Sequence, residues 1–217
     1  MDVSTAVDKR KSVRAFLDQP VDDQLIADLL EKAARAPSGG NVQPWRIYVV
    51  NGAAAERFKA FVAGRDLERP AYDIYPRDLG EPYRTSRWEL GEQMYASIGI
   101  PRDDKPARLR HVARNYELFG APAAVFCFVD RQMGPPQWSD LGMFLQTFML
   151  LAEEAGLGTC AQESWAMRER AVSEFVGAPG ELRIFCAIAL GYEDTAHPIN
   201  NFRSPRLPLA DWATFIG

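Results

Sequence analysis

The hydrophobic pattern near the start of the chain predicts a helix that begins after Asp22. Its apolar positions recur at helical spacing, at Leu25, Ile26, Leu29, Leu30, Ala33 and Ala34. The Asp22 carboxylate can accept hydrogen bonds from the free N–H groups of the first turn. Pro37 follows the last periodic position, so the helix should end there and a loop should begin.

Three short apolar runs are rich in β-branched and aromatic residues, and they predict strands. They cover Arg46–Val50, which Asn51 and Gly52 close, Ala123–Val129 and Leu182–Leu190. The long intervals between them have mostly helical patterns. The class is therefore mixed α and β, with helices packed on a sheet.

The segment Trp138–Ala155 predicts a long helix that is apolar around most of its circumference. A helix on the surface of a domain needs only one apolar stripe. This helix is therefore either central to the core or buried against a second subunit, and the pattern alone does not decide between the two.

No clear linker or internal repeat divides the 217 residues, so we expect one domain over residues 1–217. Residues 65–120 are richer in Arg, Asp, Pro and Tyr than the rest. We interpret them as a variable excursion from the core that can cover a ligand.

Composition and charge make several classes of partner and site unexpected for this chain. The chain has 47% hydrophobic residues and a net charge of −4, so we expect no nucleic-acid partner. No apolar run approaches the roughly 18 residues that span a bilayer, which predicts no membrane association and a cytoplasmic location. Cys127, Cys160 and Cys186 are widely spaced, and no Cys or His cluster has metal-ligand spacing.

Two basic clusters lie at opposite ends of the chain. Arg10, Lys11, Ser12 and Arg14 form the first, and Arg203, Ser204 and Arg206 form the second. Guanidinium groups and hydroxyls suit phosphate oxygens, so the clusters would make a phosphate pocket if the two ends met. Taken singly, each cluster is more typical of ordinary solvated charges at a chain terminus.

The loop from residue 36 to residue 45 is a second candidate for ligand binding. Gly39 and Gly40 allow a close approach of the backbone, and Ser38, Asn41 and Gln43 offer uncharged donors and acceptors. Such groups suit a ribityl chain or the edge of a heteroaromatic ring, although ordinary turns have the same composition.

Outside the basic clusters and this loop, the sequence contains no familiar catalytic motif. The segment 156–161 matches a GxGxxA dinucleotide pattern, but it ends a predicted helix where the fingerprint requires a strand before it, so we reject a Rossmann fold. His111 and His197 have no obvious partner. If the chain is an enzyme, a cofactor must supply the reactive group.

The motifs together resemble the FMN-dependent nitroreductase family. The resemblance is carried by residues 10–16 (RKSVRAF), residues 37–45 (PSGGNVQPW), Gly156–Thr159 with Gln162, Glu163 and Ser164, Gly191–Tyr192, and residues 203–208 (RSPRLP). These segments occur in the family's order and cover nearly the whole chain.

The resemblance implies an α+β fold with a central, mostly antiparallel sheet flanked by helices, and an intertwined homodimer with FMN at the subunit interface. Arg10, Ser12 and Arg206 would hold the phosphate, with Lys11 also in the cofactor-binding set and Arg203 in place of a cation that the family often has at position 204. Arg14 would face the flavin's pyrimidine edge and stabilise the reduced flavin. The other implied flavin-binding residues are Pro37, Ser38, Gly39, Asn41 and Gln43, with Pro37, Ser38 and Asn41 coming from the second subunit, and Gln162, Glu163 and Ser164.

The resemblance also implies chemistry: hydride passes from NADPH or NADH to flavin N5 and then to a nitroaromatic, with the two substrates using one cleft in turn. Tyr83, Trp88, Tyr116 and Phe119 could stack on that aromatic substrate or pack against their own domain. The family often has Lys where this chain has Ser204, and Gly where it has Ser164.

Other reactions share this fold, namely ene or quinone reduction, dehalogenation and flavin breakdown. A flavin-binding protein without turnover is a further alternative.

Overall fold

The computed structural model describes residues 1–217, and its centre is a four-stranded antiparallel sheet. The strand order is β1 (Arg46–Asn51), β2 (Ala123–Asp130), β4 (Leu182–Gly191) and β3 (Gly158–Gln162). The three strands predicted from the sequence are confirmed. Strand β3 was missed, because its five residues begin with a glycine and show no alternation of apolar and polar positions.

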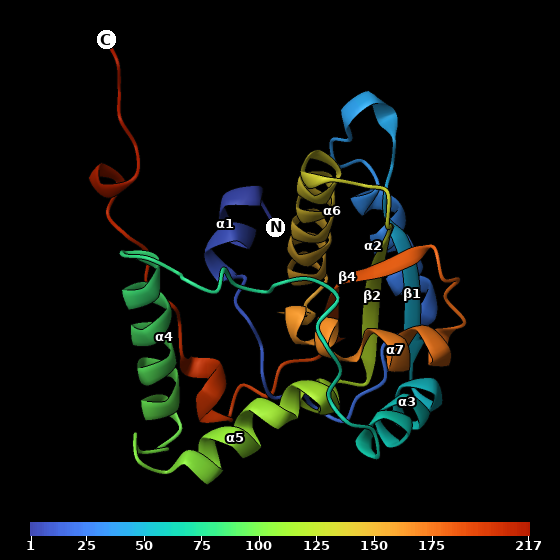
Figure 1. The fold of residues 1–217 in the computed structure, drawn as a ribbon, viewed down its shortest axis with the longest axis horizontal. Helices are drawn as coiled ribbons and strands as arrows, with labels where there is room; N and C mark the ends of the chain where they lie inside the picture. Colours follow the sequence, from blue (N-terminus) through green and yellow to red (C-terminus); the bar gives the residue numbers. More distant parts are fainter.

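The chain also forms seven α-helices, most of them close to the sheet (Figure 1). They are α1 (Val3–Lys9), α2 (Asp23–Ala33), α3 (Ala53–Ala63), α4 (Tyr83–Ser97), α5 (Lys105–Ala113), α6 (Pro135–Glu154) and α7 (Glu169–Val176). The prediction for α2 is confirmed, and the Asp22 carboxylate accepts hydrogen bonds from the N–H groups of Gln24 and Leu25. Helix α6 begins three residues before its predicted start, because Pro135 is well placed in a first turn.

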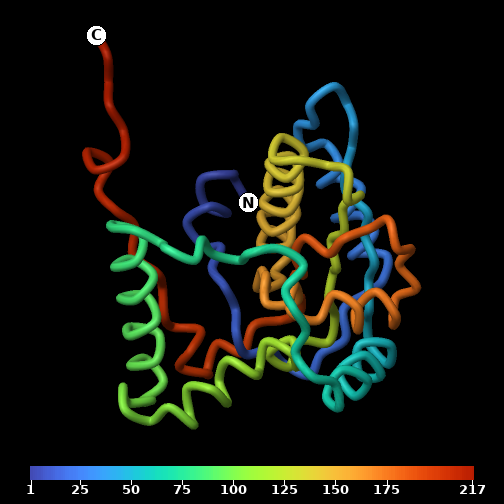
Figure 2. Tube along the Cα trace, viewed as in Figure 1, coloured from blue at the N-terminus to red at the C-terminus, as the bar shows by residue number.

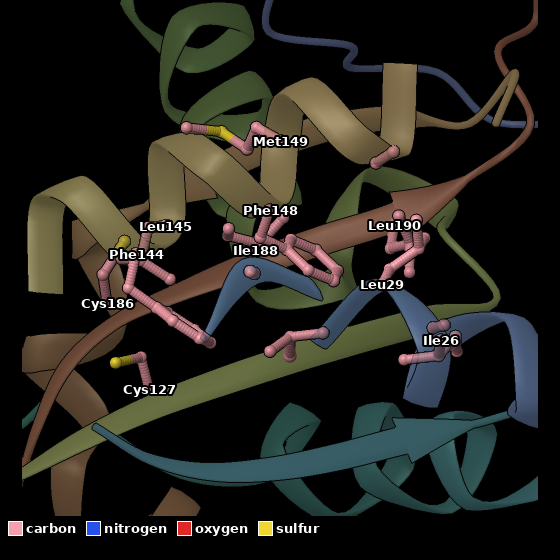
Figure 3. Packing of buried hydrophobic residues seen from close by; sticks show 14 of the residues in the cluster. Ile26, Leu29, Cys127, Phe144, Leu145, Phe148, Met149, Cys186, Ile188 and Leu190 are labelled. Carbon is pink, nitrogen blue, oxygen red and sulfur yellow. The ribbon is translucent and has the colours of Figure 1, made fainter. Parts of the chain in front are cut away.

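Hydrophobic clusters cover both faces of the sheet, since alternate residues of each strand point to opposite sides. On one face, α2 and α6 pack Leu29, Phe144 and Phe148 against the strands near Cys127 and Ile188 (Figure 3). On the other face, Phe58 of α3 and Trp165 pack against Phe126 and Phe128 of β2. Cys127 and Cys186 belong to the first cluster and Cys160 to the second, all as buried thiols.

The segment Gly156–Ala161 does not form a dinucleotide-binding turn. Gly156 has a positive φ of 78° just after α6, and β3 then begins at Gly158. The glycines therefore lead from a helix into a strand, the reverse of the fingerprint's context.

Helices α4 and α5 stand away from the sheet, as does the chain after residue 202 (Figures 1 and 2). Helix α4 has no buried residue. The C-terminal segment extends outward from α4, with Phe215 and Ile216 almost fully exposed. No helix in the structure combines the length and apolar character needed to cross a bilayer.

Candidate functional site

A cavity of about 670 Å³ lies where the two ends of the chain meet α4. The first basic cluster lines it with Arg10, Lys11, Ser12 and Arg14, and the second lines it with Arg203, Ser204 and Arg206. The two chain ends therefore meet, as a phosphate pocket requires: two basic clusters separated by about 190 residues share one cavity.

The first cluster is fixed by pairing with the edge strand β3. Ser12 forms a parallel bridge with Thr159, and the N–H of Val13 donates to the Thr159 carbonyl at 2.9 Å. A Cβ on Gly158 would lie 2.8 Å from the Val13 side chain, so only glycine allows this approach. The glycine that resembled part of a nucleotide fingerprint therefore positions the basic cluster.

Asn200 connects the two ends of the chain. Its Oδ1 accepts from the N–H of Arg14 at 2.8 Å, and its Nδ2 donates to the carbonyls of Ala15 at 2.8 Å and Asp194 at 2.9 Å. The side chain is fully buried, so losing it would leave several backbone groups unpaired. The sequence analysis missed Asn200, because a lone asparagine carries no motif.

Positive charge in the cavity is only partly balanced. Lys11 pairs with Glu193 at 2.8 Å, whereas Arg10, Arg14, Arg203 and Arg206 form no salt bridge. Burial lowers the pKa of Arg10, and the charges of Arg206 and Arg203 lower it further. Converging cations that repel one another are stabilised by an anion between them.

The guanidinium groups of the second cluster contact the nearby chain. Arg203 donates to the carbonyl of Lys9 at 3.2 Å, which joins the C-terminal cluster to the end of α1. Arg206 donates to Ser204 Oγ at 2.8 Å. Ser204, which stands where the family often has Lys, therefore orients the arginine two residues later.

The loop of residues 36–45 lies away from this cavity, beside the N-terminal part of α6. Asp140 of α6 holds it: Oδ2 accepts from the N–H of Gly39 at 3.1 Å and from Ser38 Oγ at 3.3 Å. The residues proposed to touch the flavin from this loop, apart from half-buried Ser38, are exposed: Pro37, Gly39, Asn41 and Gln43. None of them lines the cavity of the same subunit.

Three comparisons place this geometry among known proteins. The profile described as "Nitroreductase family" matches residues 7–192. The chain belongs to the nitroreductase family. It is 34% identical to a nitrobenzene nitroreductase of Ectopseudomonas oleovorans over 95% of this chain and 93% of that protein. It is also 34% identical to a 4-nitrobenzoate reductase of Pseudomonas putida, over 100% and 96% of the two chains.

Among solved structures, one is described as the FMN and NADPH-dependent nitroreductase NfnB from Sphigopyxis sp. strain HMH. Its chain is 44% identical to this one, with a TM-score of 0.96 and full coverage of both chains. Because both chains are fully covered, the likeness includes α4 and the C-terminal segment.

In this nitroreductase, the three side chains at the end of β3 and just after it differ in their surroundings. Gln162 is buried; its Nε2 donates to the Asn115 carbonyl at 2.8 Å, and its Oε1 accepts from Trp165 at 3.2 Å. The Glu163 side chain is exposed. The Ser164 hydroxyl, where the family often has Gly, is buried without a hydrogen-bond partner.

The aromatic side chains considered for substrate binding fall into two pairs. Tyr83 and Trp88 of α4 are more than half exposed, and neither lines the cavity. Tyr116 and Phe119 instead pack within their own subunit, Tyr116 against Trp165 and Phe119 in the buried core. This second pair therefore makes contacts within its own subunit, and its role in substrate binding stays a prediction.

The two histidines differ in their surroundings. His197 Nδ1 accepts from the N–H of Ile199 at 3.2 Å, so it does have a partner, in its own backbone. His111 of α5 is buried and its Nε2 has no hydrogen-bond partner. Burial lowers the pKa of His111 to about 4, with further contributions from Arg114 and Arg14.

Proposed function

We propose that this chain is an FMN-dependent nitroreductase that uses NADPH or NADH to reduce nitroaromatic compounds. The observation that carries the proposal is the meeting of Arg10, Arg14, Arg203 and Arg206, none in a salt bridge, in one cavity with Ser12 and Ser204. Such a donor set suits a phosphate monoester, which carries nearly two negative charges. The names of the relatives specify FMN, NADPH and nitroaromatic substrates, and they support the proposed cofactor, coenzyme and substrate class.

The chain's own residues fit the FMN phosphate. In this proposal Arg10, Ser12 and Arg206 bind the phosphate oxygens, and Lys11 and Arg203 add positive potential nearby. Arg14 lies further along the N-terminal segment, where the Asn200 contact fixes its backbone. Its cation would stabilise negative charge on the pyrimidine side of the cofactor.

The protein's part in the reaction is to bind and orient. When bound, FMN supplies the hydride chemistry that links the coenzyme to the nitro compound. The Glu163 and Ser164 backbone would face the cofactor from the end of β3. No acid or base of the chain is assigned a proton transfer.

We further propose that the active unit is a homodimer. Pro37, Ser38 and Asn41, which we expect to contact flavin, lie outside the cavity of their own subunit, so in this proposal they reach the cofactor of a second copy. Helix α6 turns Gly142 and Met143 outward while its other side is buried. Met143→Glu should therefore weaken the dimer without unfolding the subunit, as read by analytical ultracentrifugation and circular dichroism.

Phe148, an apolar residue of the same helix, is unsuitable for that test. Its side chain is fully buried within one subunit, so a charge there would disrupt the fold itself. A wild type that sediments as a monomer with FMN bound would contradict the dimer proposal.

The direct test of function is spectroscopic. The purified protein should absorb near 450 nm and lose this absorbance anaerobically with NADPH or NADH, and nitrobenzene or 4-nitrobenzoate should restore it. Initial-rate plots at several fixed coenzyme concentrations should be parallel lines, because both substrates use one site in turn. A yellow protein that neither coenzyme bleaches would be a flavin-binding protein without turnover.

A further inference from the structure

The cavity holds more positive charge than one phosphate requires. Its lining includes six cationic residues, Arg10, Lys11, Arg14, Arg87, Arg203 and Arg206, against one acid, Asp8. Lys11 is already paired with Glu193. A phosphate monoester carries about −1.5 to −2 at neutral pH, so cationic capacity remains after one has bound.

Arg87 differs from the other five cations in its position. The others belong to the two chain ends, whereas Arg87 belongs to α4, which forms another wall of the same cavity with Leu90, Met94 and Tyr95. The spacing of these four residues brings them onto one face of the helix. Arg87 is therefore placed for a group that approaches along α4.

The Arg87 guanidinium is held in place but has unused donors. It lies over the Tyr75 ring, with its central carbon 4.0 Å from the ring centroid, and Tyr75 also lines the cavity. Arg87 forms no salt bridge and donates no hydrogen bond within the chain. Stacking restricts the guanidinium plane and leaves its N–H edge free for an oxyanion.

We infer that Arg87, stacked on Tyr75, binds an oxyanion of a substrate, separate from the phosphate held by Arg10 and Arg206. This inference rests on the proposed function. Two substrates can carry the oxyanion: the coenzyme, through the extra phosphate that distinguishes NADPH from NADH, or the nitroaromatic, through a ring carboxylate. In either case Arg87 determines specificity and takes no part in the redox step.

The experiment compares substrates that differ only in that charged group. Holoenzymes of the wild type, Arg87→Gln, Arg87→Lys and Arg84→Gln are assayed with NADPH against NADH, and with 4-nitrobenzoate against nitrobenzene. Arg84 is the matched control, because it lies on the same helix, pairs with Glu81 and does not line the cavity.

Arg87→Gln should raise KM about tenfold for the charged member of at least one pair, because it removes a charge-assisted hydrogen bond. A rise with NADPH alone identifies the coenzyme phosphate, one with 4-nitrobenzoate alone identifies the carboxylate, and rises in both identify a shared subsite. Arg87→Lys should recover part of the loss, and Arg84→Gln should match the wild type.

Ligand binding measured by calorimetry separates this inference from the proposed function. The wild-type holoenzyme should bind 2′,5′-ADP more tightly than 5′-AMP, or benzoate more tightly than benzyl alcohol, and Arg87→Gln should remove that difference while keeping its full FMN content. A wild type without turnover would refute the proposed function and leave this binding test intact. Equal KM changes for both members of each pair, or no change in any KM, would overturn the inference.

Discussion

Helices α6 and α4 are both long, but they are stabilised in different ways. Of the 20 residues of α6, seven are buried, and they pack against the sheet, α2 and α1. Helix α4 has 15 residues and none is buried, although it carries Trp88, Leu90 and Tyr95. Tertiary packing of an apolar face normally supplies most of a helix's stability. Helix α4 therefore depends on groups outside its own subunit's core much more than α6 does.

The C-terminal segment resembles α4 in this respect. Trp212, Phe215 and Ile216 are mostly exposed, and the segment extends away from the sheet (Figure 2). The molecule thus has two regions. The inner region is the sheet with the helices packed on it, and buried apolar side chains stabilise it. The outer region is α4 with the C-terminal segment, and it carries ligand-facing residues. Segments that bind ligands are commonly drawn from the less stable parts of a fold.

The largest effect should come from truncating the inner region. Phe148→Ala removes a fully buried ring between α6 and the sheet, and it should lower the free energy of unfolding by about 3–5 kcal/mol. Urea unfolding followed by circular dichroism measures this change. A loss below about 1 kcal/mol would show that α6 is less central than its burial indicates.

The next largest effect concerns the cavity between the two regions. Arg10→Ala and Arg206→Ala should each weaken FMN binding by about 1.5–3 kcal/mol, because each removes a charge-assisted contact with phosphate. Fluorescence titration of the apoprotein measures the dissociation constant. Lys32→Ala, an exposed change on α2, is the control and should bind like the wild type. Full FMN retention by both arginine variants after extensive dialysis would refute the phosphate assignment.

A smaller effect should appear as pH dependence at His111, in α5. Burial and the nearby arginines Arg114 and Arg14 lower the pKa of His111 to about 4 in the folded state, against 6.5 for a free side chain. Between these values the unfolded chain binds a proton that the folded chain does not. Stability should therefore fall as pH falls from about 6.5 to 4, by at most about 1.4 kcal/mol per pH unit.

His111→Phe keeps an aromatic ring beside Tyr95 and Phe119 and removes the titration. Its free energy of unfolding, measured in urea at pH 7, 6 and 5, should change less with pH than that of the wild type. Equal slopes for the two proteins would mean that folding does not lower the pKa of His111.

The smallest effect on stability is expected in α4. Trp88→Ala removes a half-exposed side chain, so the free energy of unfolding of the subunit should change by less than about 0.5 kcal/mol. The same variant should raise KM for nitroaromatics if the ring contacts substrate. A stability loss comparable with that of Phe148→Ala would show that the inner and outer regions form one cooperative unit.

Local sequence patterns were enough to predict much of the inner region. The helix after Asp22, three of the four strands and most of α6 follow from apolar spacing and end signals, which act over a few residues. The basic clusters also pointed to phosphate through their chemistry alone. Strand β3 was not predicted because it is short and begins with glycine. Such a strand is recognised only by its pairing with β4 in the structure.

Sequence alone determined the class of the fold and the identities of the charged groups. The tertiary structure decided which of them meet. Asn200 and the Thr159 carbonyl bring the N-terminal and C-terminal segments to one cavity, while Asp140 holds the loop of residues 36–45 away from it. Helical and strand periodicity is set by neighbours along the chain, whereas these contacts join residues roughly 100 to 190 positions apart and form only when the sheet and its helices have packed.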